Sequence, residues 1–105
     1  MEIRSSLHDL LEDLQIWIEQ KVYVPDEIAA RFHHRLVAIH LYANGNGRHA
    51  RLMADLLLVH ILDRPHFTWG SKSLVQAGEC RACYISALRA ADRHDYRPLL
   101  EFVRS

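Results

Sequence analysis

The fold is decided by the stretch HLYANGNGRHARLMADLLLVHIL, residues 40–62, in which a polar, glycine-bearing turn precedes a long apolar run. Gly45 and Gly47 interrupt the helical spacing of apolar residues that surrounds them. We therefore predict that one helix ends near His40 and that the next runs from about Gly47 to Leu62. Because this second helix is apolar nearly all round, we expect it to be the central, buried helix of the fold.

The helical pattern continues outward from this turn in both directions. Upstream, two segments carry apolar residues three and four positions apart. We expect Ser5 or Ser6 to cap the first helix and Pro25 to begin the second. Downstream, we predict a helix from about Ser73 to Ala91 and a short last helix that starts near Asp95. The residues that we expect to face inward on these later helices and on the second one are Ile28, Phe32, Leu36, Ile39, Leu74, Tyr84, Ile85, Leu88, Leu99, Leu100 and Val103.

No segment alternates between apolar and polar residues with a period of two, so the predicted class is all-α, with about five helices around the central helix. A chain of 105 residues, half of them hydrophobic, fits one globular domain over residues 1–105. The net charge is zero, which argues against a specific nucleic-acid partner, since nucleic-acid modules are strongly cationic. Two cysteines indicate a reducing compartment. With no apolar signal region or membrane-spanning run, we predict a cytoplasmic protein without a membrane partner.

The turn itself gathers groups that bind phosphate. A helix start exposes unpaired backbone N–H groups and the positive end of the helix dipole, and the two glycines let an anion approach closely. Asn46 adds an amide donor, and Arg48 and Arg51 share one helix face. His40, at the predicted end of the preceding helix, can act as a general base. Each residue alone has an ordinary explanation, such as a helix cap or a core histidine. Together they predict a base beside a cradle for a di- or triphosphate.

These residues resemble the signature of the Fic family, His-Pro-Phe-x-(Asp/Glu)-Gly-Asn-Gly-Arg-x-x-Arg. The resemblance extends over nearly the whole chain, from the helix at residues 29–39 to the closing segments at 81–88 and 99–102. Within the family, the chain is most similar to the group called mobile mystery protein B.

The resemblance implies an all-helical domain that transfers AMP from ATP to a hydroxyl of a target protein or of the chain itself. It makes His40 the catalytic base and Tyr42, in place of the family's phenylalanine, the buried anchor of the loop. The phosphates would be held by the residues that match the rest of the signature, namely Gly45, Asn46, Gly47, Arg48 and Arg51.

Three departures from the family pattern leave the activity open. Asn44 replaces the acidic residue that holds magnesium, and a neutral amide binds Mg²⁺ or Mn²⁺ more weakly than a carboxylate does. Leu41 replaces proline, which we expect to alter loop stiffness rather than chemistry. The chain also looks truncated before the family's β-hairpin flap, which aligns the target. A nucleotide other than ATP, or a weakly active or inactive nucleotide-binding or interaction module, therefore remains an alternative. The family's inhibitory pattern is absent from the sequence, so we expect any control to come from an inhibitory partner or an upstream segment.

Smaller signals have structural explanations beside the functional ones. Trp69 and Tyr84 could line the pocket for the nucleotide base, although ordinary core packing explains both. Cys80 and Cys83 form a CxxC pattern, which we interpret as two reduced cysteines on a helix. His33, His34 and His40 suggest a metal cluster only superficially, because no carboxylate completes the set.

Overall fold

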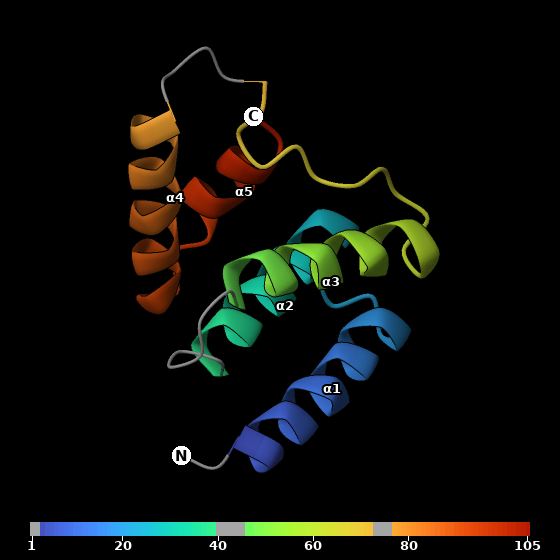
Figure 1. Cartoon of the computed structure of the whole chain (residues 1–105). Helices are drawn as coiled ribbons and strands as arrows, with labels where there is room; N and C mark the ends of the chain where they lie inside the picture. The colour runs from blue at the N-terminus through green and yellow to red at the C-terminus, as the bar shows by residue number, and fades with distance from the viewer. Residues whose placement is uncertain (1–2, 40–45, 73–76) are drawn as a thin grey trace. The chain divides into compact units, whose positions relative to one another are not determined.

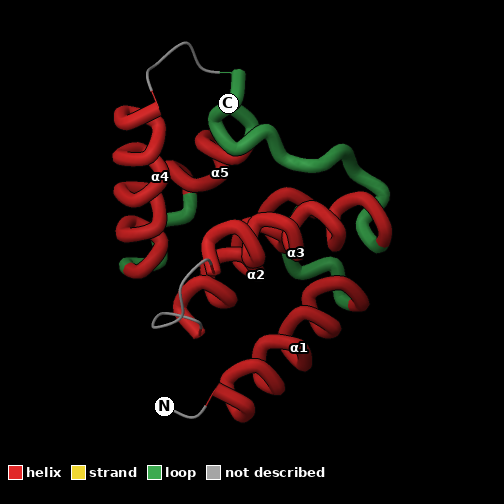
Figure 2. The backbone as a smooth tube through the Cα atoms, viewed as in Figure 1, coloured by secondary structure: helices red, strands yellow, loops and turns green. Residues whose placement is uncertain are grey.

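The computed structural model describes residues 3–39, 46–72 and 77–105. Over these residues the chain forms α-helices and no strand, which confirms the all-α class (Figure 1; Figure 2). Contacts divide it into two compact units, Met1–His66 and Phe67–Ser105, which are described one at a time. That the two together make a single domain stays a prediction. The helices are α1 Ile3–Glu19, α2 Pro25–Ile39, α3 Asn46–His60, α4 Ala77–Asp92 and α5 Arg97–Val103.

In the first unit, α2 is the helix that packs against both of its neighbours, α1 on one side and α3 on the other (Figure 1). Its start is as predicted, with Pro25 as the first residue and two acidic residues, Asp26 and Glu27, in the first turn. The prediction that Ser5 or Ser6 caps the first helix is wrong, because α1 already begins at Ile3. The buried side chains of this unit come from all three helices: Leu10, Ile28, Ala29, Ala30, Phe32, His33, Leu36, Ala50, Ala54, Leu57 and Leu58.

Helix α3 was expected to be the central, buried helix because its residues are apolar nearly all round, but it is buried along one face only. Ala50, Ala54 and the adjacent Leu57 and Leu58 form the buried face. Leu52, Leu56 and Val59 form a second apolar stripe, and they are 55%, 42% and 45% exposed. An apolar residue on a helix is covered only where a neighbouring element reaches it, and the sequence of α3 cannot specify which face that is.

Aromatic and charged side chains form part of the contact between α1, the following turn and α2. Arg31 lies over the ring of Tyr23, with the guanidinium carbon 4.0 Å from the ring centroid. The ring of Trp17 meets Tyr23 edge-on, with the two centroids 5.6 Å apart. Arg35 of α2 forms an ion pair with Asp13 of α1. These contacts are partly exposed.

The second unit is built on the packing of α4 against α5. The loop before α4 is tied to the chain end, since Thr68 and Trp69 both donate backbone hydrogen bonds to the carbonyl of Val103. Gly70 has a φ of +79°, and a Cβ there would lie 2.6 Å from Cys80 Sγ and 2.9 Å from the Phe102 ring. Only glycine therefore fits at that turn.

The inward faces of these last helices agree only in part with the prediction. Leu99 and Val103 are buried, but Ile85, expected inside, is 37% exposed, because α4 turns its alanines inward instead. Asp95 lies before α5 rather than starting it, and its carboxylate accepts a hydrogen bond of 3.3 Å from the backbone N–H of Arg97. Leu74, with Ser73, lies outside the described residues. The alanines that are buried on α4 are Ala87, Ala90 and Ala91.

Candidate functional site

The signature falls at the junction of α2 and α3, as predicted. Helix α2 has Ile39 as its last residue, and α3 begins at Asn46. The predicted end near His40 and start near Gly47 are therefore confirmed. The candidate base, loop anchor, metal position and first phosphate-binding glycine lie outside the described residues; they are His40, Tyr42, Asn44 and Gly45.

The described part of the site is the start of α3. Asn46 and Gly47 are its first two residues, and Arg48 and Arg51 follow within the first two turns. Arg48 is exposed, whereas Arg51 is half-buried. No acidic residue stands in the first turn to offset the positive end of the helix dipole. Backbone N–H groups, the dipole and two guanidinium groups thus coincide at one helix end, an arrangement suited to a phosphate or a chain of phosphates.

Between the two arginines in the sequence, Ala50 of α3 contacts a buried histidine of α2. His33 is fully buried, as is Ala50, and the imidazole forms a hydrogen bond with the backbone of Ala50. The pKa of His33 is lowered from 6.5 to about 4, chiefly because burial disfavours the charged ring. The electrostatic interactions with Arg51 and with His34 lower this pKa further, while the hydrogen bond with Ala50 opposes them. The ring is therefore neutral at neutral pH.

From the sequence, His33 was considered only as a metal ligand, and its contact with Ala50 was not predicted. Its signal in the sequence was a histidine between the inward-facing Phe32 and Leu36, on the buried side of the helix that leads to the signature. Among the residues described here, no group of three or more His, Cys, Asp or Glu side chains could hold a metal ion.

The two aromatic residues considered for a base pocket both belong to the second unit. Trp69 meets the ring of Phe67 edge-on at 5.2 Å, and it has a φ of 51°. Tyr84 of α4 stacks at a tilt against Phe102 of α5, with the ring centroids 5.4 Å apart. Each thus has a packing partner in its own unit, and their role at a nucleotide base stays a prediction.

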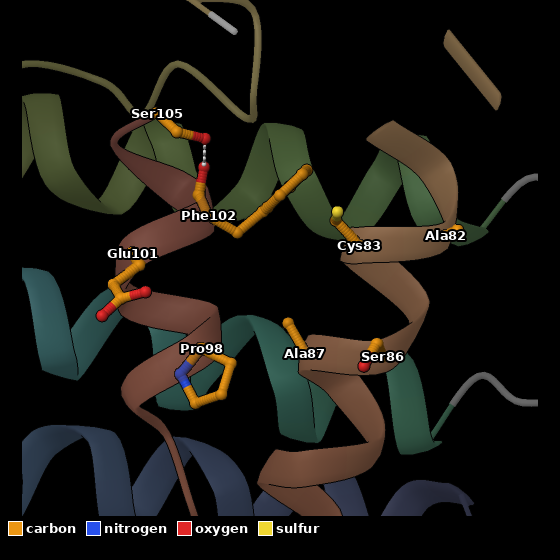
Figure 3. Close-up of a pocket in the computed structure, with 8 residues that line it drawn as sticks. All are labelled: Ala82, Cys83, Ser86, Ala87, Pro98, Glu101, Phe102 and Ser105. Atoms are coloured by element: carbon orange, nitrogen blue, oxygen red, sulfur yellow. Dashed lines mark hydrogen bonds between the residues drawn. The ribbon is translucent and has the colours of Figure 1, made fainter. Parts of the chain in front are cut away.

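The second unit also has an open hollow of about 560 Å³ between α4 and α5. Figure 3 shows Cys83 and Ala87 of α4 facing Pro98 and Phe102 of α5 across it. Cys83 is exposed at its rim, and Cys80 is half-buried one turn earlier on the same helix. Both cysteines are unbridged and lie on α4, which confirms that they are helical; that they are reduced stays a prediction.

None of the helices described here has the length and apolar character needed to cross a bilayer.

Comparison with known proteins identifies the family. A sequence model of the Fic/DOC family matches residues 2–58, which is more than half of the chain and includes α1, α2, the signature and most of α3. The chain therefore belongs to the Fic/DOC family. Its narrower resemblance to the mobile mystery protein B group stays a prediction.

Curated relatives match over most of the chain. The protein adenylyltransferase fic-1 of Caenorhabditis elegans is 31% identical over 96 residues, which cover 89% of this chain and 17% of the relative. The protein adenylyltransferase Fic of Aedes aegypti is 29% identical over 102 residues, covering 94% of this chain and 19% of the relative. The protein adenylyltransferase Fic of Nematostella vectensis is 32% identical over 85 residues, which cover 81% of this chain and 18% of the relative. The chain thus spans less than a fifth of the length of these relatives. No solved structure matches it significantly.

Proposed function

We propose that this chain is the helical core of a protein adenylyltransferase that moves AMP from ATP to a hydroxyl of a protein. The observation that carries the proposal is the position of the signature, with Arg48 and Arg51 in the first two turns of α3 and the candidate base, His40, directly after the last residue of α2. The names of the relatives, each a protein adenylyltransferase, support the same reaction.

In this reaction His40 takes the proton from the hydroxyl of the target. The hydroxyl oxygen then attacks the α-phosphorus of ATP, and the bond from that phosphorus to the oxygen bridging to the β-phosphate breaks. AMP stays on the target and pyrophosphate leaves. Arg48, Arg51 and the backbone N–H groups from Gly45 to Gly47 hold the β- and γ-phosphates, where negative charge collects as the bond breaks. Donors that are already in place for developing charge are the largest single contribution to many such reactions.

The residues of this chain fit a resident magnesium ion poorly. The family's metal position is occupied by Asn44, whose neutral amide offers one oxygen and no charge. The described residues offer no alternative cluster of ligands. Divalent ions therefore enter the proposal only as counterions of ATP, and no step above passes through a metal bound by the protein.

The same asparagine favours a second candidate function, a nucleotide-binding module with little or no transfer activity. In that case the phosphate cradle of α3 binds ATP or another nucleotide, and the base at residue 40 has no reaction to catalyse. The two functions differ in one observable property, since only the transferase attaches AMP covalently and does so through His40.

The deciding experiment is the intact mass of the purified chain after incubation with ATP and Mg²⁺ or Mn²⁺. We expect a gain of one adenylyl group by self-modification, lost in His40→Ala and kept in His60→Ala. His60 is a suitable control because it is an exposed histidine at the far end of α3. ATP binding should survive in His40→Ala and fall in Arg51→Ala.

Two results would contradict the proposal. One is a mass gain that persists in His40→Ala, which would decide against His40 as the base. The other is ATP binding without any gain, in the wild type and in Asn44→Asp alike, which would establish the binding module. Repeating the incubation with other nucleoside triphosphates tests the nucleotide preference.

A further inference from the structure

The contact between His33 and Ala50 plays no part in the reaction described above. It joins a fully buried side chain of α2 to the backbone of α3, within the first two turns of that helix. Ala50 lies between the two arginines of the site, two residues after Arg48 and one before Arg51. The ring also lies close enough to Arg51 for that charge to lower its pKa.

A polar ring is a costly choice for a position that is 0% exposed, because an apolar side chain would need no hydrogen bond there. What the histidine adds is a contact with a preferred direction. The buried face of α3 near this point consists of small side chains, Ala50 and Ala54, which pack closely but resist sliding and rotation little. A hydrogen bond to the backbone has a narrow range of distance and angle, so it defines where that turn of the helix stands on α2.

We propose that His33 is a positioning residue, which holds the start of α3 on α2 so that Arg48 and Arg51 meet the phosphates of a bound nucleotide. It acts through the backbone of Ala50 and does not touch the nucleotide. The inference rests on the proposed use of these arginines for phosphate binding. It adds a residue outside the signature to the phosphate site, one that belongs to the preceding helix.

The test compares His33→Gln with His33→Asn. Both variants replace the ring by the same neutral amide, but the asparagine side chain is shorter by one carbon and does not reach the Ala50 backbone. The glutamine keeps an N–H donor at about the reach of the imidazole. Leu10→Val serves as a control that removes buried volume from another helix of the same unit, α1.

Two quantities are measured at neutral pH, the affinity for ATP by calorimetry and the hydrogen exchange of backbone amides in residues 46–54 without nucleotide. In His33→Asn we expect faster exchange in this segment and weaker ATP binding, by roughly tenfold to a hundredfold, which is the size of effect that small misplacements of site groups produce. His33→Gln should retain most of both properties. Leu10→Val should lower the melting temperature without changing ATP affinity.

The outcomes separate this inference from the proposed function. Unchanged exchange in His33→Asn, or equal ATP affinity in the asparagine and glutamine variants, overturns the role of His33. Failure of the wild-type chain to bind ATP overturns the proposed function, while the exchange data still decide whether His33 fixes the start of α3. If Leu10→Val loses as much ATP affinity as His33→Asn does, the loss follows from a general decrease in stability. That result would also overturn the inference.

Discussion

The first unit has two helix junctions, and they are built in opposite ways. Between α1 and α2, an ion pair of Asp13 with Arg35 and the rings of Trp17 and Tyr23 lie partly in solvent. Between α2 and α3, alanines pack closely, and the polar contact, from His33, is fully buried and neutral. Exposed charged contacts are screened and contribute little, whereas a buried contact is costly to break. The candidate site belongs to the second junction, so its arginines lie on a helix that buried contacts hold against α2.

The largest effect is expected from the buried face of α3. Leu58→Ala should lower the free energy of unfolding by about 3 to 5 kcal/mol, because Leu58 is 0% exposed and the cavity left behind cannot close fully. Leu56→Ala makes the same chemical change on the exposed stripe of that helix and should cost less than about 1 kcal/mol. Urea denaturation measures both. Equal losses would mean that the stripe of Leu52, Leu56 and Val59 is covered in solution.

The next effect is a dependence of stability on pH that originates at His33. Its pKa is near 6.5 when exposed and about 4 in the fold, so between these values the unfolded chain binds more protons than the folded one. The contribution of His33 to the free energy of unfolding should therefore be fully present above pH 6.5 and decrease as the pH drops towards 4. Below pH 4 it should change no further, and the total loss should be about 3 kcal/mol. The ionisable groups that act on the ring are Arg51 of α3 and His34 of α2.

Urea denaturation at a series of pH values measures this dependence, with His33→Gln as the reference because it lacks the titrating group. The difference between wild type and variant isolates His33 from the other histidines. Parallel curves for the two proteins would show that the ring is not neutral and buried in solution.

The smallest effect should come from the exposed junction. Asp13→Asn removes the ion pair with Arg35 and should cost less than about 1 kcal/mol, with the loss greatest at low ionic strength. Asp9→Asn, at an exposed position of the same helix, controls for the change in net charge. A loss comparable to that of Leu58→Ala, or one insensitive to salt, would contradict the contrast between the two junctions.

Much of the fold could be predicted because its signals are local. Pro25 sets the start of α2 through its own backbone geometry, and α3 begins at Asn46, within the polar, glycine-bearing stretch where the apolar spacing breaks. The predicted caps at Ser5 and Ser6 failed because a serine is also tolerated inside a helix, and α1 begins before both. The inward position of Ile85 failed because burial depends on a neighbour, and α4 turns its alanines inward instead.

For the site, the sequence alone determined the kinds of groups and their order along the chain. The signature, its two arginines and its place between two helices all follow from residue types and spacing, because backbone dihedrals and side-chain charge are properties of the residues themselves. Only the tertiary structure decided that the buried face of α3 is the one with Ala50, Ala54, Leu57 and Leu58, and that His33 is buried against Ala50. Both facts depend on which surfaces of separate helices meet, and burial, with the shift in the pKa that it causes, exists only after they have met.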